Sequence, residues 1–431
     1  MNNPLSWGRF SVDGSEPLEA RLRELVQQVG EATQRQFGPD ELAALLVVGG
    51  YGRGEGGVER VGGREEPHNN IDFLLIAHDE RRPLNALKAR LDSAIEPIRQ
   101  QAPLGIDVGV SSVQRLRRSP ALVFWYDLRF GHKSVLGEPS LMSSMRHFRL
   151  NRIPSWDVRN LLTNRGTLLL INAHMRAHGA AQPRQLLRHA MKAIIGYGDA
   201  LLFAHGRYHW SYQEKRRRMR GIAGQYPSFA QLYDQAMGFR FAPDYATFLS
   251  ASFDLEAWMA KVEQALPAVH LAFEAFRLRN PALQWPTYLS EALTHALTDE
   301  ALSAASWARK LRNALRALRQ PTLRREPLSM LRHPALANAP ARASLGALCS
   351  TETNLLSLLF PLVAYGEGHG LQLSDDEASL LASLLAAQGC EPAALRRAYL
   401  HTWARYGDIN FLGLLQRIEQ ADATTSLGEE A

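Results

Sequence analysis

Cysteine is scarce in this chain. Only two cysteines, Cys349 and Cys390, occur among its 431 residues, and they lie far apart in separate apolar segments. Such a pair can form neither a disulfide framework nor a thiolate zinc site within the chain. Because free cysteines are among the most buried residues of proteins, we expect both to be small core residues.

Long apolar runs are also absent. No window approaches the roughly 18 uninterrupted apolar residues that indicate a spanning helix. The N-terminal segment MNNPLSWGRF has no charged head followed by an apolar stretch. We therefore expect a cytoplasmic protein without a membrane span. A hydrophobic content of 46% fits a globular chain with room for two or three domains.

Several catalytic motifs are missing as well. The glycine-rich segment of residues 47–57 has no Lys followed by Ser or Thr after its last glycine, which excludes a Walker A phosphate loop. His174 and His178 have the spacing of zinc ligands, but the glutamate that a zinc hydrolase needs after the first histidine is absent. No Gly-x-Ser-x-Gly segment presents a nucleophilic serine.

Positive charge is present but dispersed. The net charge is +6, and the arginines are spread over much of the chain, so charge alone does not identify an anionic partner. One basic run could be a solvated helix end or an anion contact, and its members are Lys215, Arg216, Arg217, Arg218 and Arg220. The basic stretch of residues 307–333 could pack Leu311, Leu315 and Leu318 into a helical domain, or contact RNA, an acidic membrane surface or an acidic protein. Because stacking aromatics are not interleaved there, small-molecule or protein substrates are favoured over nucleic acid.

Hydrophobic periodicity predicts an α+β protein. Residues 15–36 place apolar side chains at helical spacing. Three short runs rich in branched residues predict strands at 42–50, 71–77 and 105–112, and the helical spacing of residues 81–100 separates the last two. From about residue 152 onward, apolar residues recur every three or four positions, which predicts helices. The expected regions are an N-terminal helix (1–36), a sheet domain (37–150), a helical domain (151–290) and a second helical domain or its continuation (291–431).

Gly52, Gly54 and Gly57 satisfy the spacing of a dinucleotide-binding fingerprint. Such a fingerprint must open a helix that packs on the sheet. The residues that follow, GVERVGGREEPHNN, are polar and carry no apolar helical stripe. The segment therefore does not predict a dinucleotide site.

Another interpretation accounts for more of these residues. VVGGYGRGEG ends one strand, NNIDFLLI begins the next, and GIDVGV supplies a carboxylate on a third. This layout resembles the nucleotidyltransferase superfamily, which has the fold of DNA polymerase beta. The resemblance covers roughly residues 40–140, where FWYDLRFGHKSVLGEP looks like the strand elements that close such a domain. It implies a nucleotidyltransferase-type mixed sheet followed by helices.

The resemblance also assigns roles to residues. Asp72 and Asp107 would be the catalytic carboxylates and, with position 70 on the same strand face, would hold magnesium or manganese. A nucleoside triphosphate would contact Gly49, Gly50, Gly52, Arg53 and Lys192. The glycine amides would lie against its phosphates, and the arginine would add a bidentate contact. Lys192 would meet a phosphate from a helix after the sheet, unless it only forms a salt bridge on that helix with Asp199.

Asn70 departs from the family's pattern, because the family has its first carboxylate there. An amide oxygen supplies no negative charge and binds magnesium poorly. Either Asp72 and Asp107 hold one ion, or catalysis is lost, or a third ligand comes from the loop residues Glu55, Glu65, Glu66 or His68. Both aspartates could instead be ordinary turn residues at strand starts.

The expected function is magnesium-dependent transfer of a nucleoside monophosphate from a triphosphate to a hydroxyl of a small molecule or protein. The alternative is an inactive relative that binds nucleotide or a partner protein.

Overall fold

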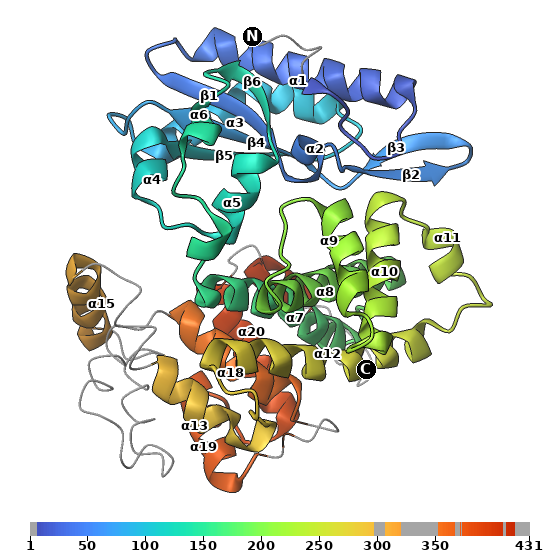
Figure 1. Ribbon diagram of the computed structural model, residues 1–431, viewed down its shortest axis with the longest axis vertical. Coiled ribbons are helices and arrows are strands. Elements are labelled where there is room, and N and C mark those ends of the chain that lie inside the picture. Colours follow the sequence, from blue (N-terminus) through green and yellow to red (C-terminus); the bar gives the residue numbers. More distant parts are fainter. Residues whose placement is uncertain are drawn as a thin grey trace, which may run out of the picture. The chain divides into compact units, whose positions relative to one another are not determined.

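The chain divides into two compact units (Figure 1). The computed structural model describes residues 7–296, 307–319, 352–366, 371, 373–407 and 411–418. The sheet unit combines Met1–Asp157 with Arg207–Phe253, and the helical unit combines Val158–Gly206 with Asp254–Ala431. The sheet unit therefore includes a helical segment from the middle of the chain. These divisions fall at other points than the boundaries expected at residues 150 and 290.

A four-stranded mixed sheet forms the centre of the sheet unit. In spatial order its strands are β5 (Ile106–Ser112), β4 (Ile71–Ala77), β1 (Leu42–Val48) and β6 (Lys133–Gly137). β1 is antiparallel to β4 and β6, whereas β4 and β5 are parallel. The apolar residues that fill β1 and β4 suit strands covered on both faces. The three strands expected from the sequence are confirmed, as is the helix between the last two, α3 (Leu84–Gln101).

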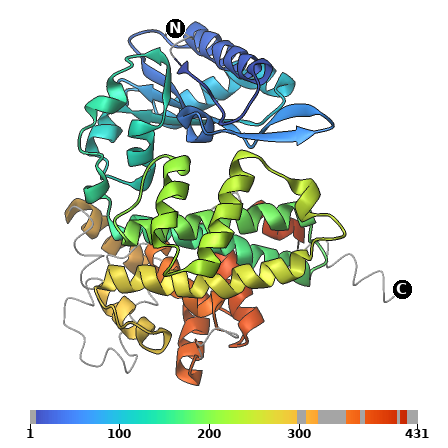
Figure 2. The same ribbon diagram turned by 45° about the vertical axis from the view of Figure 1, so that its right-hand side comes forward.

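Helices cover both faces of this sheet (Figure 2). α1 (Glu16–Gln36) and α3 enclose one apolar core with the face that carries Phe73 and Leu75. The opposite face, which carries Leu74, packs in a second core with residues of three short helices. These helices are α4 (Val113–Arg118), α5 (Val123–Phe130) and α6 (Leu141–Ser144). Alternation along β4 thus sends its even-numbered side chains to the second face.

The segment expected to close the domain with strands is only partly extended. KSVLG forms β6, but FWYDLRF forms α5, so the expectation of a strand was wrong there. The apolar side chains of α5 lie at helical spacing, with Val123, Tyr126 and Leu128 buried. The spacing of buried positions therefore decided against a strand, in spite of the aromatic residues.

The glycine-rich segment forms one helical turn followed by a hairpin. α2 (Gly49–Arg53) begins directly after β1, and Gly54 ends it in the left-handed conformation with φ 74°. β2 (Gly57–Val61) and β3 (Arg64–His68) then pair in antiparallel fashion. The segment expected to be a loop thus begins as a helical turn. Its polar continuation is no helix, as the sequence indicated.

Short helices complete the described part of the sheet unit: η2 (Leu150–Arg152), α9 (Tyr212–Met219), η3 (Arg220–Ile222), α10 (Pro227–Phe241) and α11 (Tyr245–Phe248). The basic run on α9 is mostly paired within the protein. Arg216 donates two hydrogen bonds of 2.7 Å to Asp234. Arg217 and Arg218 both pair with Glu214. This pairing favours a structural role for these three arginines.

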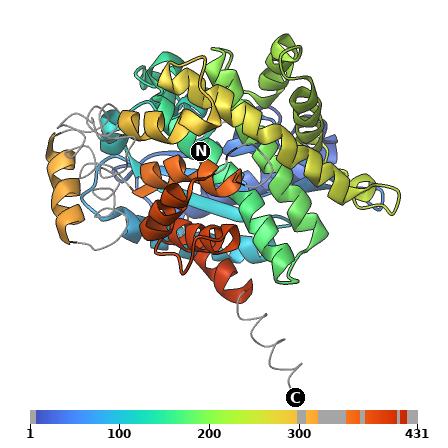
Figure 3. The same cartoon turned by 90° about the horizontal axis from the view of Figure 1, so that it is seen from below.

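The described part of the helical unit contains helices and no strand. Its helices are α7 (Ser155–Ala177), α8 (Pro183–Ala204), α12 (Leu255–Leu278), α13 (Trp285–His295), α15 (Trp307–Arg319), α18 (Glu352–Ala364), α19 (Asp375–Leu385) and α20 (Pro392–Tyr406). α8 packs along α12, and α20 packs against α18 and α19 (Figure 3). The chain is therefore α+β, with a small mixed sheet near the N-terminus and a mostly helical C-terminal region. No helix in the described ranges is long and apolar enough to cross a membrane.

Two expectations for this unit changed. Leu311 and Leu315 of α15 are 62% and 48% exposed, so these leucines are not packed into a helical core. Cys390 is exposed, although we expected a core residue, because it lies in the short turn between α19 and α20. Cys349 lies outside the described residues.

Candidate functional site

Asp72 and Asp107 are direct neighbours on the sheet. They are paired in the register of the parallel strands β4 and β5, so their side chains leave the same face. Both lie near the beginnings of their strands, where Asp72 is half-buried and Asp107 is exposed. The structure thus brings together the two carboxylates that the sequence singled out.

Gly49 makes room for Asp72 at the start of α2. A β-carbon on Gly49 would lie 2.5 Å from Oδ2 of Asp72, and the φ of 67° is one that residues with side chains rarely adopt. At Gly50 a β-carbon would lie 3.2 Å from Nη2 of Arg240. The first turn of a helix has N–H groups without helical acceptors. Gly49 and Gly50 therefore let a carboxylate and a guanidinium lie directly against the backbone at the start of α2.

Arg240 is a component of the site that the sequence did not indicate. It lies on α10, and its guanidinium carbon is 3.8 Å from the centre of the Tyr212 ring, which fixes its position. Among the described residues, no carboxylate forms an ion pair with Arg240, and its Nε has no hydrogen-bond partner. A guanidinium in this state is suited to a phosphate. Because the arginines are dispersed along the chain, no local pattern could have selected this one.

Asn70 contacts Asp107 directly. Its Nδ2 donates a hydrogen bond of 2.7 Å to Oδ2 of Asp107. Gly105 provides the space, since a β-carbon there would lie 2.5 Å from Oδ1 of Asn70. Asn70 thus turns an N–H toward the carboxylate of its neighbour.

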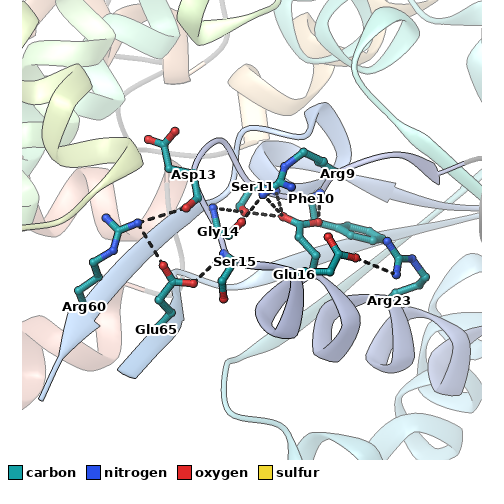
Figure 4. Close-up of polar contacts among 11 residues, drawn as sticks. Arg9, Phe10, Ser11, Asp13, Gly14, Ser15, Glu16, Arg23, Arg60 and Glu65 are labelled. Atoms are coloured by element: carbon teal, nitrogen blue, oxygen red, sulfur yellow. Dashed lines mark hydrogen bonds and ion pairs between the residues drawn. The ribbon is translucent and has the colours of Figure 1, made fainter. Parts of the chain in front are cut away.

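The four loop residues that could have supplied a third metal ligand have other partners. Glu55 is buried, and it accepts hydrogen bonds from Oγ of Ser211 and the amide of Tyr212 at the start of α9. Glu65 accepts from the amide of Ser15 at 2.7 Å and pairs with Arg60 (Figure 4).

The other two are also held by neighbours. Glu66 lies 3.6 Å from Arg21, and Nε2 of His68 lies 3.0 Å from the hydroxyl of Tyr245. These contacts disfavour all four as a third metal ligand.

The donor set fits one divalent cation better than two. Carboxylate oxygens are the ligands that magnesium prefers, and Asp72 and Asp107 meet on one face. Within the described ranges, no group of three or more His, Cys, Asp or Glu side chains is placed to hold a metal. Asn70 adds an amide but no negative charge.

Arg53 has a different environment from the one expected. Its Nη2 lies 2.8 Å from Oδ2 of Asp127, and both side chains are about nine-tenths buried. The hydroxyl of Tyr208 also donates to Asp127, at 3.0 Å. Although burial opposes the charge, the carboxylate of Asp127 raises the pKa of Arg53 above its ordinary value. The guanidinium therefore holds α2 to α5, and a phosphate would have to compete with Asp127 for it.

Gly52 is packed against backbone. A β-carbon at Gly52 would lie 2.5 Å from the carbonyl oxygen of Val47 and 3.2 Å from that of Gly131. The next residue toward the N-terminus, Tyr51, is buried and donates from its hydroxyl to the carbonyl of His68 at 3.0 Å. The missing side chain of Gly52 thus serves the contact between α2 and β1.

Lys192 belongs to the other unit. It lies on α8 with an exposed side chain, whereas Asp199 on the same helix is buried. The residues that the structure brings together in the sheet unit are therefore Gly49, Gly50, Asn70, Asp72, Asp107 and Arg240. The phosphate contact expected for Lys192 stays a prediction.

Comparison with known proteins adds no relative. No protein-family model, no curated protein and no solved structure matches this chain.

Proposed function

We propose that the sheet unit binds a nucleoside triphosphate together with one divalent cation. It transfers the nucleoside monophosphate to a hydroxyl of a small molecule or protein. The observation that carries this proposal is the pairing of Asp72 and Asp107 in register, with Asp72 against Gly49. The position of Arg240 beside Gly50 supports the proposal, because the guanidinium adds a phosphate ligand next to the two glycines.

Each group has a chemical role in this reaction. Gly49 and Gly50 leave the backbone accessible to phosphate oxygens, where a side chain would obstruct the approach. Arg240 donates N–H groups to the β- or γ-phosphate and offsets its charge. Asp72 and Asp107 would hold magnesium or manganese, which supplies positive charge against the triphosphate.

In the transfer, the acceptor oxygen forms a bond to the α-phosphorus and loses its proton. The bond from the α-phosphorus to the bridging oxygen breaks, and pyrophosphate leaves.

A second function, nucleotide binding without transfer, is favoured by Asn70. Its N–H is directed at Asp107, so one carboxylate oxygen is already occupied and the third negative charge is missing. Two carboxylates suffice to bind a cation with a triphosphate, but they neutralise less of the charge that develops on the leaving group.

Thermal unfolding with a panel of nucleotides and metals tests the binding step. Triphosphate with magnesium or manganese should raise the melting temperature more than either alone, because only the native state binds them. Asp72→Asn and Asp107→Asn should abolish that increase, whereas Asp40→Asn, at an exposed aspartate of the same unit, should preserve it. If triphosphate with the metal stabilises all three variants equally, the proposed site is wrong.

Pyrophosphate release distinguishes the two functions. Asn70→Asp restores a third carboxylate and should strengthen divalent-cation binding at least tenfold. If the protein is a transferase, the wild type releases pyrophosphate from a triphosphate in the presence of its acceptor, and the variant does so faster. Tight nucleotide binding by both proteins without any release would favour the binding function.

A further inference from the structure

The helical unit contains a large cavity that lies wholly within that unit. Its volume is about 1020 Å³, and residues of α7, α19 and α20 line it. Small-molecule pockets in proteins have volumes of roughly 300 to 1000 Å³, so the space suits an organic ligand. Nothing in the proposed nucleotidyl transfer requires it.

Two helices present basic and imidazole groups to this cavity at regular spacing. On α20, Arg397, His401 and Arg405 follow one another at intervals of four residues and all line it. His174 near the end of α7 and His178, the residue directly after this helix, have the same spacing, and their ring centres lie 4.2 Å apart. Residues four apart lie on the same face of a helix. Each helix therefore turns one stripe of such groups toward the same space.

The described lining residues include no aspartate or glutamate. α20 itself, PAALRRAYLHTWARY, contains no acidic residue along its whole length. Positively charged side chains on a concave wall raise the local concentration of anions. The guanidinium groups of Arg396, Arg397 and Arg405 also match the planar geometry of carboxylate and phosphate.

Apart from Ser383, Gln388, Thr402 and Tyr406, apolar side chains form the rest of the wall. They are Leu170, Leu384, Leu385, Leu400 and Leu412, with several alanines. A smaller cavity of about 220 Å³ shares the lining residues Leu170, Ala173 and Arg396 with the large one, and Leu266 and Phe360 help to line it. The cationic groups therefore adjoin an apolar space, which would take the body of a ligand out of water.

We propose that this cavity binds an organic anion that has a phosphate or carboxylate head and an apolar body. The head contacts the arginines of α20, and the body lies against the leucines of α7 and α19. The site is independent of the nucleotide site in the sheet unit.

Calorimetric titration of the full chain tests this with four probes. Octyl phosphate and octanoate combine both features with different heads, octanol has only the apolar body, and inorganic phosphate has only the charge. At least one amphiphilic anion should bind tenfold or more tightly than octanol and inorganic phosphate. The difference between octyl phosphate and octanoate identifies the head group.

Three variants locate the binding. Arg405→Glu reverses one exposed charge of the wall, and Ala177→Trp fills the cavity from an exposed position on α7. Each variant should bind the amphiphilic anion at least tenfold more weakly than the wild type. Arg188→Glu makes the same charge change at an exposed position of α8 outside the cavity lining, and it should change affinity less than twofold.

Several outcomes would overturn the proposal. If octanol binds as tightly as octyl phosphate, the cavity recognises only the apolar body. If inorganic phosphate binds as tightly as octyl phosphate, the site recognises only the charge. Equal effects of Arg405→Glu and Arg188→Glu would place the contact elsewhere. Ala177→Trp keeps the charge, so its result stands even if the charge reversal disturbs α20; unchanged melting temperatures establish that each variant is folded.

Discussion

The sheet unit and the helical unit arrange their charged side chains in opposite ways. Around the glycine segment of the sheet unit, Arg53 pairs with the buried carboxylate of Asp127, while Asp72 and Arg240 lie beside the backbone of Gly49 and Gly50. In the helical unit, basic groups gather on a cavity wall whose described lining residues include no carboxylate.

A charged residue's place in a sequence motif does not show whether its charge is available to a ligand. Arg53 stands at the expected place in the sequence, but a buried carboxylate from another element holds it. Arg240 stands in no motif, but the packing of α10 leaves its guanidinium beside Gly50. Pairing decides which charge remains for a ligand.

The largest expected effect tests the buried pair. Arg53→Met leaves Asp127 buried without its cation, and the free energy of unfolding should fall by about 3 to 5 kcal/mol. Arg277→Met is the counterpart in the helical unit, where Arg277 and Glu274 are fully buried and 2.8 Å apart, and it should cost about as much. Denaturant unfolding of the full chain measures both. A loss below about 1 kcal/mol at Arg53 would restore its role as a phosphate contact.

The next effect compares glycines in the two units. Gly52→Ala places a β-carbon 2.5 Å from a backbone oxygen, so it should destabilise the protein by about 3 kcal/mol. Gly389→Ala in the helical unit meets no atom within 4 Å and should be nearly neutral. The melting temperatures of the two variants test this. If Gly52→Ala melts like wild type but no longer binds triphosphate, Gly52 belongs to the phosphate site after all.

The helical unit should lose stability in acid because of His270. Burial lowers the pKa of His270 to about 4, with nearby Arg159 and Arg277 acting in the same direction and Glu274 opposing them. In the unfolded chain the imidazole takes a proton near pH 6.5. Between pH 6.5 and about 4 the unfolded state therefore binds more protons, and unfolding becomes more favourable as the pH falls.

The variant His270→Gln isolates this contribution. Because it cannot titrate, the fall in unfolding free energy between pH 6.5 and 4 should be smaller than in wild type by about 2 to 3 kcal/mol. Identical pH slopes for both proteins would show that His270 is not held neutral. The absolute stability of the variant does not matter for this comparison, since the lost hydrogen bond to Tyr365 lowers it at every pH.

The smallest effect sharpens the contrast between the two arginines. Arg240→Met should weaken triphosphate binding about tenfold, the equivalent of about 1.4 kcal/mol, and should change the unfolding free energy by less than 1 kcal/mol. Arg53→Met should do the reverse, provided binding is measured where the protein stays folded. Calorimetric titration and denaturant unfolding of both variants provide the comparison. Equal affinity in wild type and Arg240→Met would remove Arg240 from the site.

Much of the sheet layer could be predicted because its signals are local. A strand needs a short run of branched residues, and alternation fixes which side chains share a face. These two rules were enough to place Asp72 and Asp107 on strands, and the parallel pairing of β4 and β5 then brought them together. α5 was missed because aromatic residues suit strands as well as buried helix faces.

The sequence by itself determined β1, β4 and β5, the helical spacing and the two aspartates, because strand and helix periods are properties of neighbouring residues. Only the tertiary structure decided the rest of the site. Glu55 accepts a hydrogen bond from the start of α9, and Arg53 forms an ion pair with Asp127. Arg240 extends from α10 to lie beside Gly50. Each of these contacts joins residues more than 70 positions apart, and a residue's nearest neighbours in sequence carry no information about such a partner.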